Sequence, residues 1–255
     1  RSLKPLFDKE VNERAPRDNF FHCLVNAAHQ FHRRESNDDR YIIAGYPWFK
    51  CRARDTFISL PGLTLSIEED DYFELVMKTA MKGYYEFMEG KPVTVHIAEI
   101  DQPDVPLWAV WALQQYAKEK GKEACLKKYG KFIKDVVMYV KCNHHPNLKL
   151  MPNGLLYTDG KDKAVTWMNS TANGHPVVPR TGYIVEFNAL WYNALCFCAS
   201  LCELAGKEKD QQLFLEAAEL AKQSFLDTFL NEYGYLYDYV DGKMIDWSVR
   251  PNMIF

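Results

Sequence analysis

The segment from residue 44 to residue 56 carries residue types that are typical of a carbohydrate site. Tyr46 and Trp48 offer aromatic faces that can stack on the apolar face of a sugar ring. Arg54 and Asp55 offer rigid charged groups that bind hydroxyls in pairs. Asp55 also stands where the first turn of a following helix is expected, and there it can cap free backbone N–H groups and interact with the helix dipole. The sequence is consistent with both roles.

Further candidates come later in the chain. Trp167 can stack on a sugar or anchor a loop, and Arg180 can bind hydroxyls or hold a carboxylate in a salt bridge. Glu186 opens a predicted helix, where a carboxylate is favoured by the helix dipole and where its oxygens can also face a ligand. Asp104 stands in the same way before another helix, which carries Trp108. These alternatives stay open at the level of the sequence.

Apolar residues at helical spacing predict the elements that position these candidates. A lead-in helix is expected between residues 17 and 33, followed by a short strand at Tyr41–Ala44. Pro106 falls in the first turn of one later helix, and Gly90 ends another. The six later helices cover roughly residues 57–65, 73–88, 104–116, 126–140, 187–202 and 214–229.

The lengths of the connections favour helical hairpins. Residues 66–70, 118–122 and 206–210 are short links, as antiparallel helix pairs require, whereas 35–55, 89–104 and 143–185 are long. In an array of hairpins the long connections emerge on one face, where binding sites are usually built. We expect the last of them to form a small β-excursion, with strands after Asn153 and at Val165–Met168.

Composition limits the classes of function. The chain has 255 residues, 47% of them hydrophobic, and a net charge of -3, so it can bury a large core and shows no sign of nucleic-acid binding. No apolar segment approaches the roughly 20 residues that span a bilayer, so no membrane association is expected. Seven cysteines suggest reduced thiols in a cytoplasmic protein. Metal binding by the group at Cys196, Cys198 and Cys202 is a minor alternative.

Several motifs together resemble a known family, the amylo-α-1,6-glucosidase domain of prokaryotic glycogen debranching enzymes. The matches run in order from about residue 27 to the last residue. They are Ala44-Gly45-Tyr46-Pro47-Trp48-Phe49, Arg54-Asp55-Thr56, Leu60-Pro61-Gly62-Leu63, Thr166-Trp167-Met168, Pro179-Arg180, Val185-Glu186, Asn188-Ala189-Leu190-Trp191-Tyr192-Asn193 and Arg250-Pro251-Asn252.

The resemblance implies an all-α fold, an (α/α)6 toroid of helical hairpins, of which about half is present in this chain. We divide the chain into a lead-in helix and strand at residues 1–43 and the first half of a glucosidase domain at 44–255. Both ends are expected to be cut from something longer. The site residues implied are Tyr46, Trp48, Arg54, Asp55, Asp104, Trp108, Trp167, Arg180 and Arg250 for substrate, and Asn169 and Glu186 for catalysis.

The resemblance also implies a reaction, the inverting hydrolysis of single α-1,6-linked glucose stubs on glycogen or limit dextrin, without a metal or organic cofactor. Such a reaction needs a general acid and a second carboxylate that activates water. The family usually has aspartate as the acid where this chain has Asn169, and an amide cannot serve as an acid. Asp159 and Asp162 are substitutes in the same connection. The second carboxylate is expected beyond the Arg-Pro-Asn motif.

Two other functions remain open beside hydrolysis. Asn169 favours a catalytically impaired glucan-binding fragment or paralogue, whose partners would be glycogen, limit dextrin or malto-oligosaccharide. A helical-repeat scaffold for protein interaction is the third, although aromatics and arginines scattered over three loops do not suit a flat docking surface. The sequence leaves open the choice between α-1,6 and α-1,4 linkages, any transferase activity and the oligomeric state.

Overall fold

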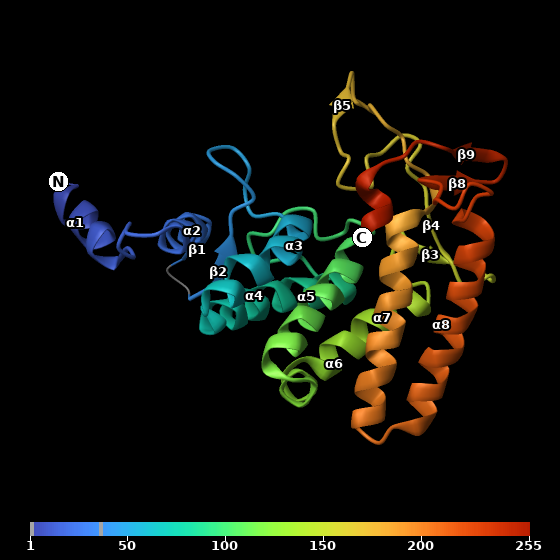
Figure 1. The fold of residues 1–255 in the computed structure, drawn as a ribbon, viewed down its shortest axis with the longest axis horizontal. Helices are drawn as coiled ribbons and strands as arrows, with labels where there is room; N and C mark the ends of the chain where they lie inside the picture. The colour runs from blue at the N-terminus through green and yellow to red at the C-terminus, as the bar shows by residue number, and fades with distance from the viewer. Residues whose placement is uncertain (1–2, 36–37) are drawn as a thin grey trace.

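The computed structural model describes residues 3–35 and 38–255, and most of this chain is α-helical (Figure 1). The helices in the described parts are α1 (Lys4–Glu13), α2 (Phe20–His29), α3 (Ala53–Leu63), α4 (Asp70–Met88), α5 (Val105–Lys120), α6 (Lys122–Lys141), α7 (Val185–Leu204) and α8 (Glu208–Phe229). The prediction of a mainly helical fold is confirmed. Helix α1, which buries none of its residues, is an addition to the predicted set.

Helices α3 to α8 form three consecutive hairpins. Helix α3 is joined to α4 through the 3-10 helix η1 (Leu65–Ile67), and α7 is joined to α8 by residues 205–207. Gly121 alone links α5 to α6, and its φ of 92° is a conformation that favours glycine. The predicted short connections are therefore confirmed. Closure of such hairpins into a six-hairpin toroid stays a prediction.

The first helices of the three pairs lie next to one another. Helix α3 contacts α5, and α5 contacts α7. The side-chain amides of Gln114 on α5 and Asn193 on α7 exchange two hydrogen bonds of 3.0 and 2.9 Å. Helices α5 and α7 bury residues on most of their faces, whereas α8 buries only a few. Helices α3, α5 and α7 therefore form the inner layer of the array.

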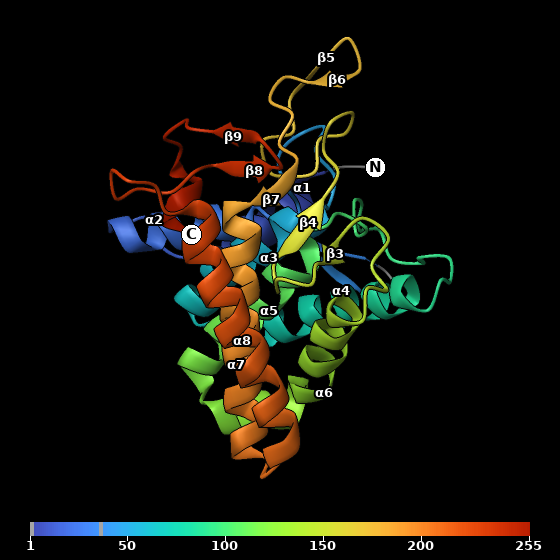
Figure 2. The same cartoon turned by 90° about the vertical axis from the view of Figure 1, so that its right-hand side faces the viewer.

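The strands are short, and those of the largest sheet collect where α7 begins (Figure 2). The first two, β1 (His32–Arg34) and β2 (Arg40–Ile42), form a hairpin before α3. The others are β3 (Lys149–Leu150), β4 (Leu156–Thr158), β5 (Thr171–Ala172), β6 (His175–Pro176), β7 (Gly182–Ile184), β8 (Tyr239–Asp241) and β9 (Met244–Asp246). Five of them form an antiparallel sheet in the order β3-β4-β7-β8-β9.

The predicted β-excursion between residues 143 and 185 is confirmed, since β3 to β7 all lie within it. The strand expected at Val165–Met168 is wrong, because this segment has no strand structure. Val165 is nevertheless buried, so its apolar character reflects packing rather than strand pairing.

Strands β8 and β9 follow α8 and complete the sheet from the far end of the chain. Gly182 permits this pairing, because its φ is 85° and a Cβ there would lie 2.3 Å from the carbonyl oxygen of Val240. The backbone N–H of Val185 donates to the carbonyl oxygen of Asp238 at 3.1 Å. The sheet thus brings residues just before β8 to the start of α7. The 3-10 helix η2 (Pro251–Ile254) then packs against α7.

The inner helices begin at the end of the molecule that holds the long connections. In Figure 1 the turn between α7 and α8 lies at the opposite end from β8 and β9. A parallel bridge between Arg52 and Ala98 places the connection before α5 beside the start of α3. Within the described residues, no helix is both long and apolar enough to cross a membrane.

Candidate functional site

Arg54 and Asp104 form a buried pair at the starts of α3 and α5. The Arg54 Nε lies 2.5 Å from Asp104 Oδ2, and its second guanidinium nitrogen lies 2.9 Å from Oδ1. The indole N–H of Trp108 donates to the same carboxylate at 3.2 Å. Burial by itself lowers the pKa of Arg54, but Asp104 raises it and the net direction is upward. Arg54 is therefore a fixed cation, held in one orientation by a two-point contact.

A hollow of about 420 Å³ opens beside this pair. Its walls come from the segment before α3, the connection before α5 and the third long connection. The residues that line it are Phe49, Arg52, Arg54, Glu99, Gln102, Ala164, Asn169 and Ser170. The hollow, which we call the pit, therefore brings together two predicted site residues, Arg54 and Asn169, from positions far apart in the sequence.

The wall of the pit carries charge on both sides. Arg52 and Glu99, which both line the pit, form an ion pair with a guanidinium nitrogen 3.0 Å from a carboxylate oxygen. The guanidinium of Arg52 also lies 5.5 Å from the centre of the Phe49 ring. The carboxylate of Asp55, in the first turn of α3, has no hydrogen bond or ion pair to any described residue, so it does not cap the helix. Arg52, the residue before α3, makes no side-chain cap bond either. The capping role considered for Asp55 is therefore not the one adopted.

A second buried arginine lies at the start of α7. Arg180 bonds both oxygens of Glu186, one of them at 2.6 Å, and also binds Asp238 through its Nε at 2.8 Å. Asp238 in turn accepts from Arg250 at 2.6 Å, and Arg250 lies 3.1 Å from Asp246. Arg180, Glu186 and Asp238 are each no more than 2% exposed. The salt-bridge role considered for Arg180 is the one the structure adopts.

Burial raises the pKa of the Glu186 carboxyl, and the bonds from Arg180 oppose this shift without cancelling it. Glu186 stands in the first turn of α7, and Ile184, the residue before the helix, makes no side-chain cap bond. Because both of its oxygens face Arg180, Glu186 touches a ligand only if this pair opens. We call the five residues Glu186, Arg180, Asp238, Arg250 and Asp246 the α7 network.

The C-terminal segment links the α7 network to the pit. Asn252 donates to Asp238 Oδ1 at 2.6 Å and accepts from the indole N–H of Trp167 at 2.8 Å. Trp167 stands two residues before Asn169 in the same loop. On the other side, the Phe255 ring lies 5.7 Å from that of Trp108, edge to face. Residues 252–255 therefore connect the starts of α5 and α7.

The remaining predicted residues lie apart from the pit. Trp48 is 79% exposed, and Tyr46 is also exposed, with its hydroxyl donating to the carbonyl oxygen of Gln30. Trp108 is buried and contacts Asp104 rather than open space. A sugar-stacking role for Tyr46, Trp48 and Trp167 stays a prediction.

Asp238 is the main residue that the sequence analysis missed. A local signal existed, because Asp241-Gly242 between apolar residues is typical of a β-hairpin. That signal predicts the hairpin of β8 and β9, but it does not predict that β8 pairs with β7. The contact of Asp238 with Arg180 spans 58 residues and depends on the pairing of β8 with β7.

A comparison with protein-family models supplies the identity that the geometry leaves open. The model described as amylo-alpha-1,6-glucosidase matches residues 25–255. The chain belongs to this family. The match covers every element from within α2 to η2, and so it includes the pit and the α7 network. A search of curated protein sequences gave no match. Membership makes the chain a glycoside hydrolase of the debranching-enzyme type and confirms the predicted resemblance.

Proposed function

We propose that the pit binds a terminal glucose unit, and that the protein removes α-1,6-linked glucose stubs from glycogen or limit dextrin with inversion. The observation that carries this proposal is the Arg54–Asp104 pair at the edge of the pit. Asp104 engages two of the guanidinium N–H groups, and the others remain available as rigid donors for sugar hydroxyls. In the same turn of α3, the Asp55 carboxylate helps to raise the pKa of Arg54 and accepts no hydrogen bond from a described side chain, so it can accept from a sugar hydroxyl.

The catalytic groups follow from which side chains can reach a bound sugar. Asn169 lines the pit where the family pattern has the general acid, and its amide cannot supply that proton. Glu186 is sealed by Arg180, so within this proposal it holds Arg180 in place and does not act on the substrate. Hydrolysis by the chain with Asn169 is then slow, because general acid catalysis typically contributes about 10²–10⁴-fold.

Glucose release from a phosphorylase limit dextrin tests the proposal. Arg54→Lys keeps the charge but loses the two-point geometry, so we expect kcat/KM to fall by about 100-fold. Arg40→Lys is the matched control, since Arg40 lies on β2 and pairs with Asp38 at 3.6 Å. Equal rates for the two variants would contradict the proposal. The first product observed by NMR should be β-glucose, and α-glucose would rule out inversion.

A glucan-binding protein without hydrolysis is the second candidate, and Asn169 in the pit favours it. This candidate predicts retention on immobilised glycogen with no release of glucose. Asn169→Asp separates the two, because it restores a carboxylic acid at the wall of the pit. We expect a gain of about 10²-fold or more in the rate of release if the pit is catalytic. No gain, with retention on glycogen unchanged, would favour the binding protein.

A further inference from the structure

A hollow of about 480 Å³ is built from two of the chain segments that also contribute to the pit, together with β1. Residues 50–51 and 95–98 line this hollow, whereas Arg52 and Glu99, which follow them in the same segments, line the pit. The bridge between Arg52 and Ala98 joins the two segments. The hollow shares no lining residue with the pit, and its size lies within the roughly 300–1,000 Å³ of small-molecule sites.

Three basic side chains line this hollow, and none of the described residues that line it is acidic. They are Arg33 on β1, Lys50 before α3 and His96 before α5. The side chains of Arg33 and His96 are 41% and 67% exposed, and Lys50 is also exposed, so a ligand in solution can reach all three. We call this space the basic hollow.

Glu35 fixes two of the three basic groups from outside the basic hollow. Its Oε1 lies 2.6 Å from a guanidinium nitrogen of Arg33 and 3.0 Å from Nδ1 of His96. The His96 ring also stacks on the ring of Tyr41, with the ring centres 6.3 Å apart. Glu35 and the Cys51 thiol engage only part of the five N–H groups of Arg33, so the others remain available to a ligand.

Lys50 supplies a cation without a partner. Its ammonium makes no hydrogen bond or ion pair with any residue that the structure describes. Glu35 offsets the charge of Arg33, so the basic hollow keeps the positive charge of Lys50 and gains a second one when His96 is protonated. A phosphate monoester carries a charge of about −1.5 to −2 at pH 7, which this excess of positive charge complements.

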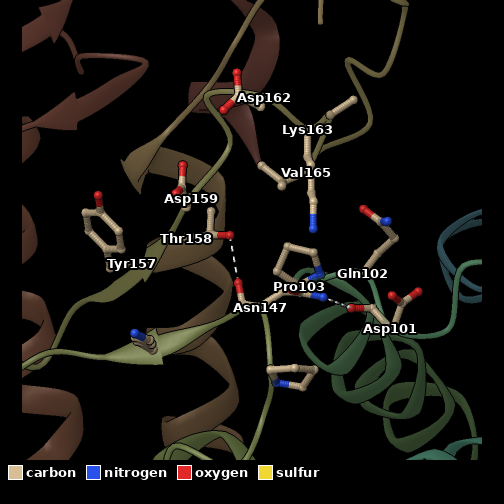
Figure 3. Close-up of a pocket in the computed structure, with 13 residues that line it drawn as sticks. Asp101, Gln102, Pro103, Asn147, Tyr157, Thr158, Asp159, Asp162, Lys163 and Val165 are labelled. Atoms are coloured by element: carbon tan, nitrogen blue, oxygen red, sulfur yellow. Dashed lines mark hydrogen bonds between the residues drawn. The ribbon is translucent and has the colours of Figure 1, made fainter. Parts of the chain in front are cut away.

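The hollow between the connection before α5 and the loop after β4 has a different charge pattern (Figure 3). Its charged lining residues are Asp101, Asp159 and Asp162 together with Lys149 and Lys163. Carboxylates outnumber ammonium groups there, and this disfavours an anion. The positive character of the basic hollow is therefore a local feature of a chain whose net charge is -3.

We infer that the basic hollow binds a small metabolite that carries a phosphate monoester group. Arg33 and Lys50 bind the phosphate oxygens, because a guanidinium fork and an ammonium point charge both suit phosphate. The hollow has room for more than the phosphate group, and Val95 and Ile97 give part of its wall an apolar character that suits the organic part of the ligand. The inference does not depend on the proposed function of the pit.

Calorimetric titration with fructose 6-phosphate tests this inference, because the sugar of this probe is not the glucose proposed for the pit. Lys50→Ala removes the unpaired cation, and loss of a charged hydrogen bond should weaken binding about tenfold. Lys50→Arg keeps the charge and should stay within about threefold of the parent affinity. Lys91→Ala is the matched control, since Lys91 lies in the same connection as His96, pairs with Glu89 and does not line the basic hollow.

The outcomes either support or overturn the inference. Weaker binding in Lys50→Ala, with Lys50→Arg and Lys91→Ala like the parent, supports it. Absence of binding by the parent protein, or equal affinities for Lys50→Ala and the parent, overturns it. Fructose should show no binding, and inorganic phosphate should bind more weakly than fructose 6-phosphate; equal affinities of the two phosphates would overturn the assignment of an ester. A larger loss in Arg54→Lys than in Lys50→Ala would place the ester in the pit and overturn the inference.

Discussion

Two arginine–carboxylate contacts stand at the starts of the inner helices, and they differ in what surrounds them. Arg54 has Asp104 as its one hydrogen-bonded carboxylate within the described residues, and it borders an open hollow. Arg180 is held by Glu186 and Asp238 together, inside a sealed set of charges. The first arrangement leaves donors free for a ligand. The second uses nearly all of its bonding capacity to fix β7, β8 and α7 to one another.

The comparison teaches that a charged residue at a helix start is not by itself a binding group. Asp104 immediately precedes α5 and Glu186 is the second residue of α7, so both carboxylates stand at helix starts, and the sequence assigns both to the site. Only Asp104 presents its arginine to a space that a ligand can enter. The α7 network is better understood as the clamp that joins the end of the described chain to the start of α7.

The largest effect should come from breaking the α7 network. Asp238→Asn leaves Arg180 and Arg250 without their shared carboxylate in a dry environment, so we expect the free energy of unfolding to fall by about 3–5 kcal/mol. Asp104→Asn should cost less, about 1–3 kcal/mol, because water in the pit can solvate Arg54. Urea unfolding followed by circular dichroism measures both. A larger loss of unfolding free energy for Asp104→Asn than for Asp238→Asn would show that the Arg54–Asp104 pair, and not the α7 network, is the more important of the two for stability.

A third buried group, His145, adds a pH dependence of its own to the free energy of unfolding. His145 is 3% exposed, and burial lowers its pKa to about 4. The unfolded chain therefore binds the proton more tightly than the folded one. The contribution of neutral His145 to the free energy of unfolding is complete above its ordinary pKa of 6.5. As the pH falls toward 4, the free energy of unfolding decreases by about 3 kcal/mol.

His145→Phe should remove this pH dependence from the free energy of unfolding, whatever its effect at neutral pH. His144→Phe is the matched control, since His144 is the exposed neighbour. Urea unfolding between pH 4 and pH 7 makes the comparison. A slope that persists in His145→Phe would contradict the assignment of the acid sensitivity to His145.

The smallest effect should come from Glu186→Gln. Arg180 keeps its bonds to Asp238, and burial of the Glu186 charge is already costly, so the free energy of unfolding at pH 7 should change by less than about 1 kcal/mol. The pKa of Glu186 is raised in the folded protein. Its contribution to the free energy of unfolding is therefore greatest below the ordinary pKa of 4.5 and is lost as the pH rises through the folded-state pKa.

Glucose release by Glu186→Gln tests whether Glu186 only holds Arg180 or acts in catalysis. If Glu186 only holds Arg180, release from limit dextrin stays within about tenfold of the parent rate. Arg54→Lys is the contrasting variant, with its expected fall of about 100-fold. A loss for Glu186→Gln as large as that for Arg54→Lys would restore Glu186 to a catalytic role.

Local sequence signals predicted the helices and one wall of the pit. Pro106 in the first turn of α5 and Gly90 just after α4 were such signals, because their backbone preferences act within one turn. Arg54 and Asn169 were identified as site residues from motifs, and both line the pit. The strand expected at Val165–Met168 was wrong, because Val165 is buried by packing without pairing in the sheet, and a local pattern of apolar residues does not distinguish the two.

The sequence by itself determined that the chain makes helical hairpins and which family it belongs to, because helical periodicity, turn residues and family motifs are short-range features. Only the tertiary structure decided which charged residues border an open hollow and which are buried in a network of ion pairs. Asp104 lies 50 residues from Arg54, and Asp238 lies 58 residues from Arg180. Contacts between residues so far apart in the sequence depend on how helices and strands pack. Burial and pairing, rather than residue type, therefore explain why Arg54 borders the open pit while Arg180 is enclosed in the α7 network.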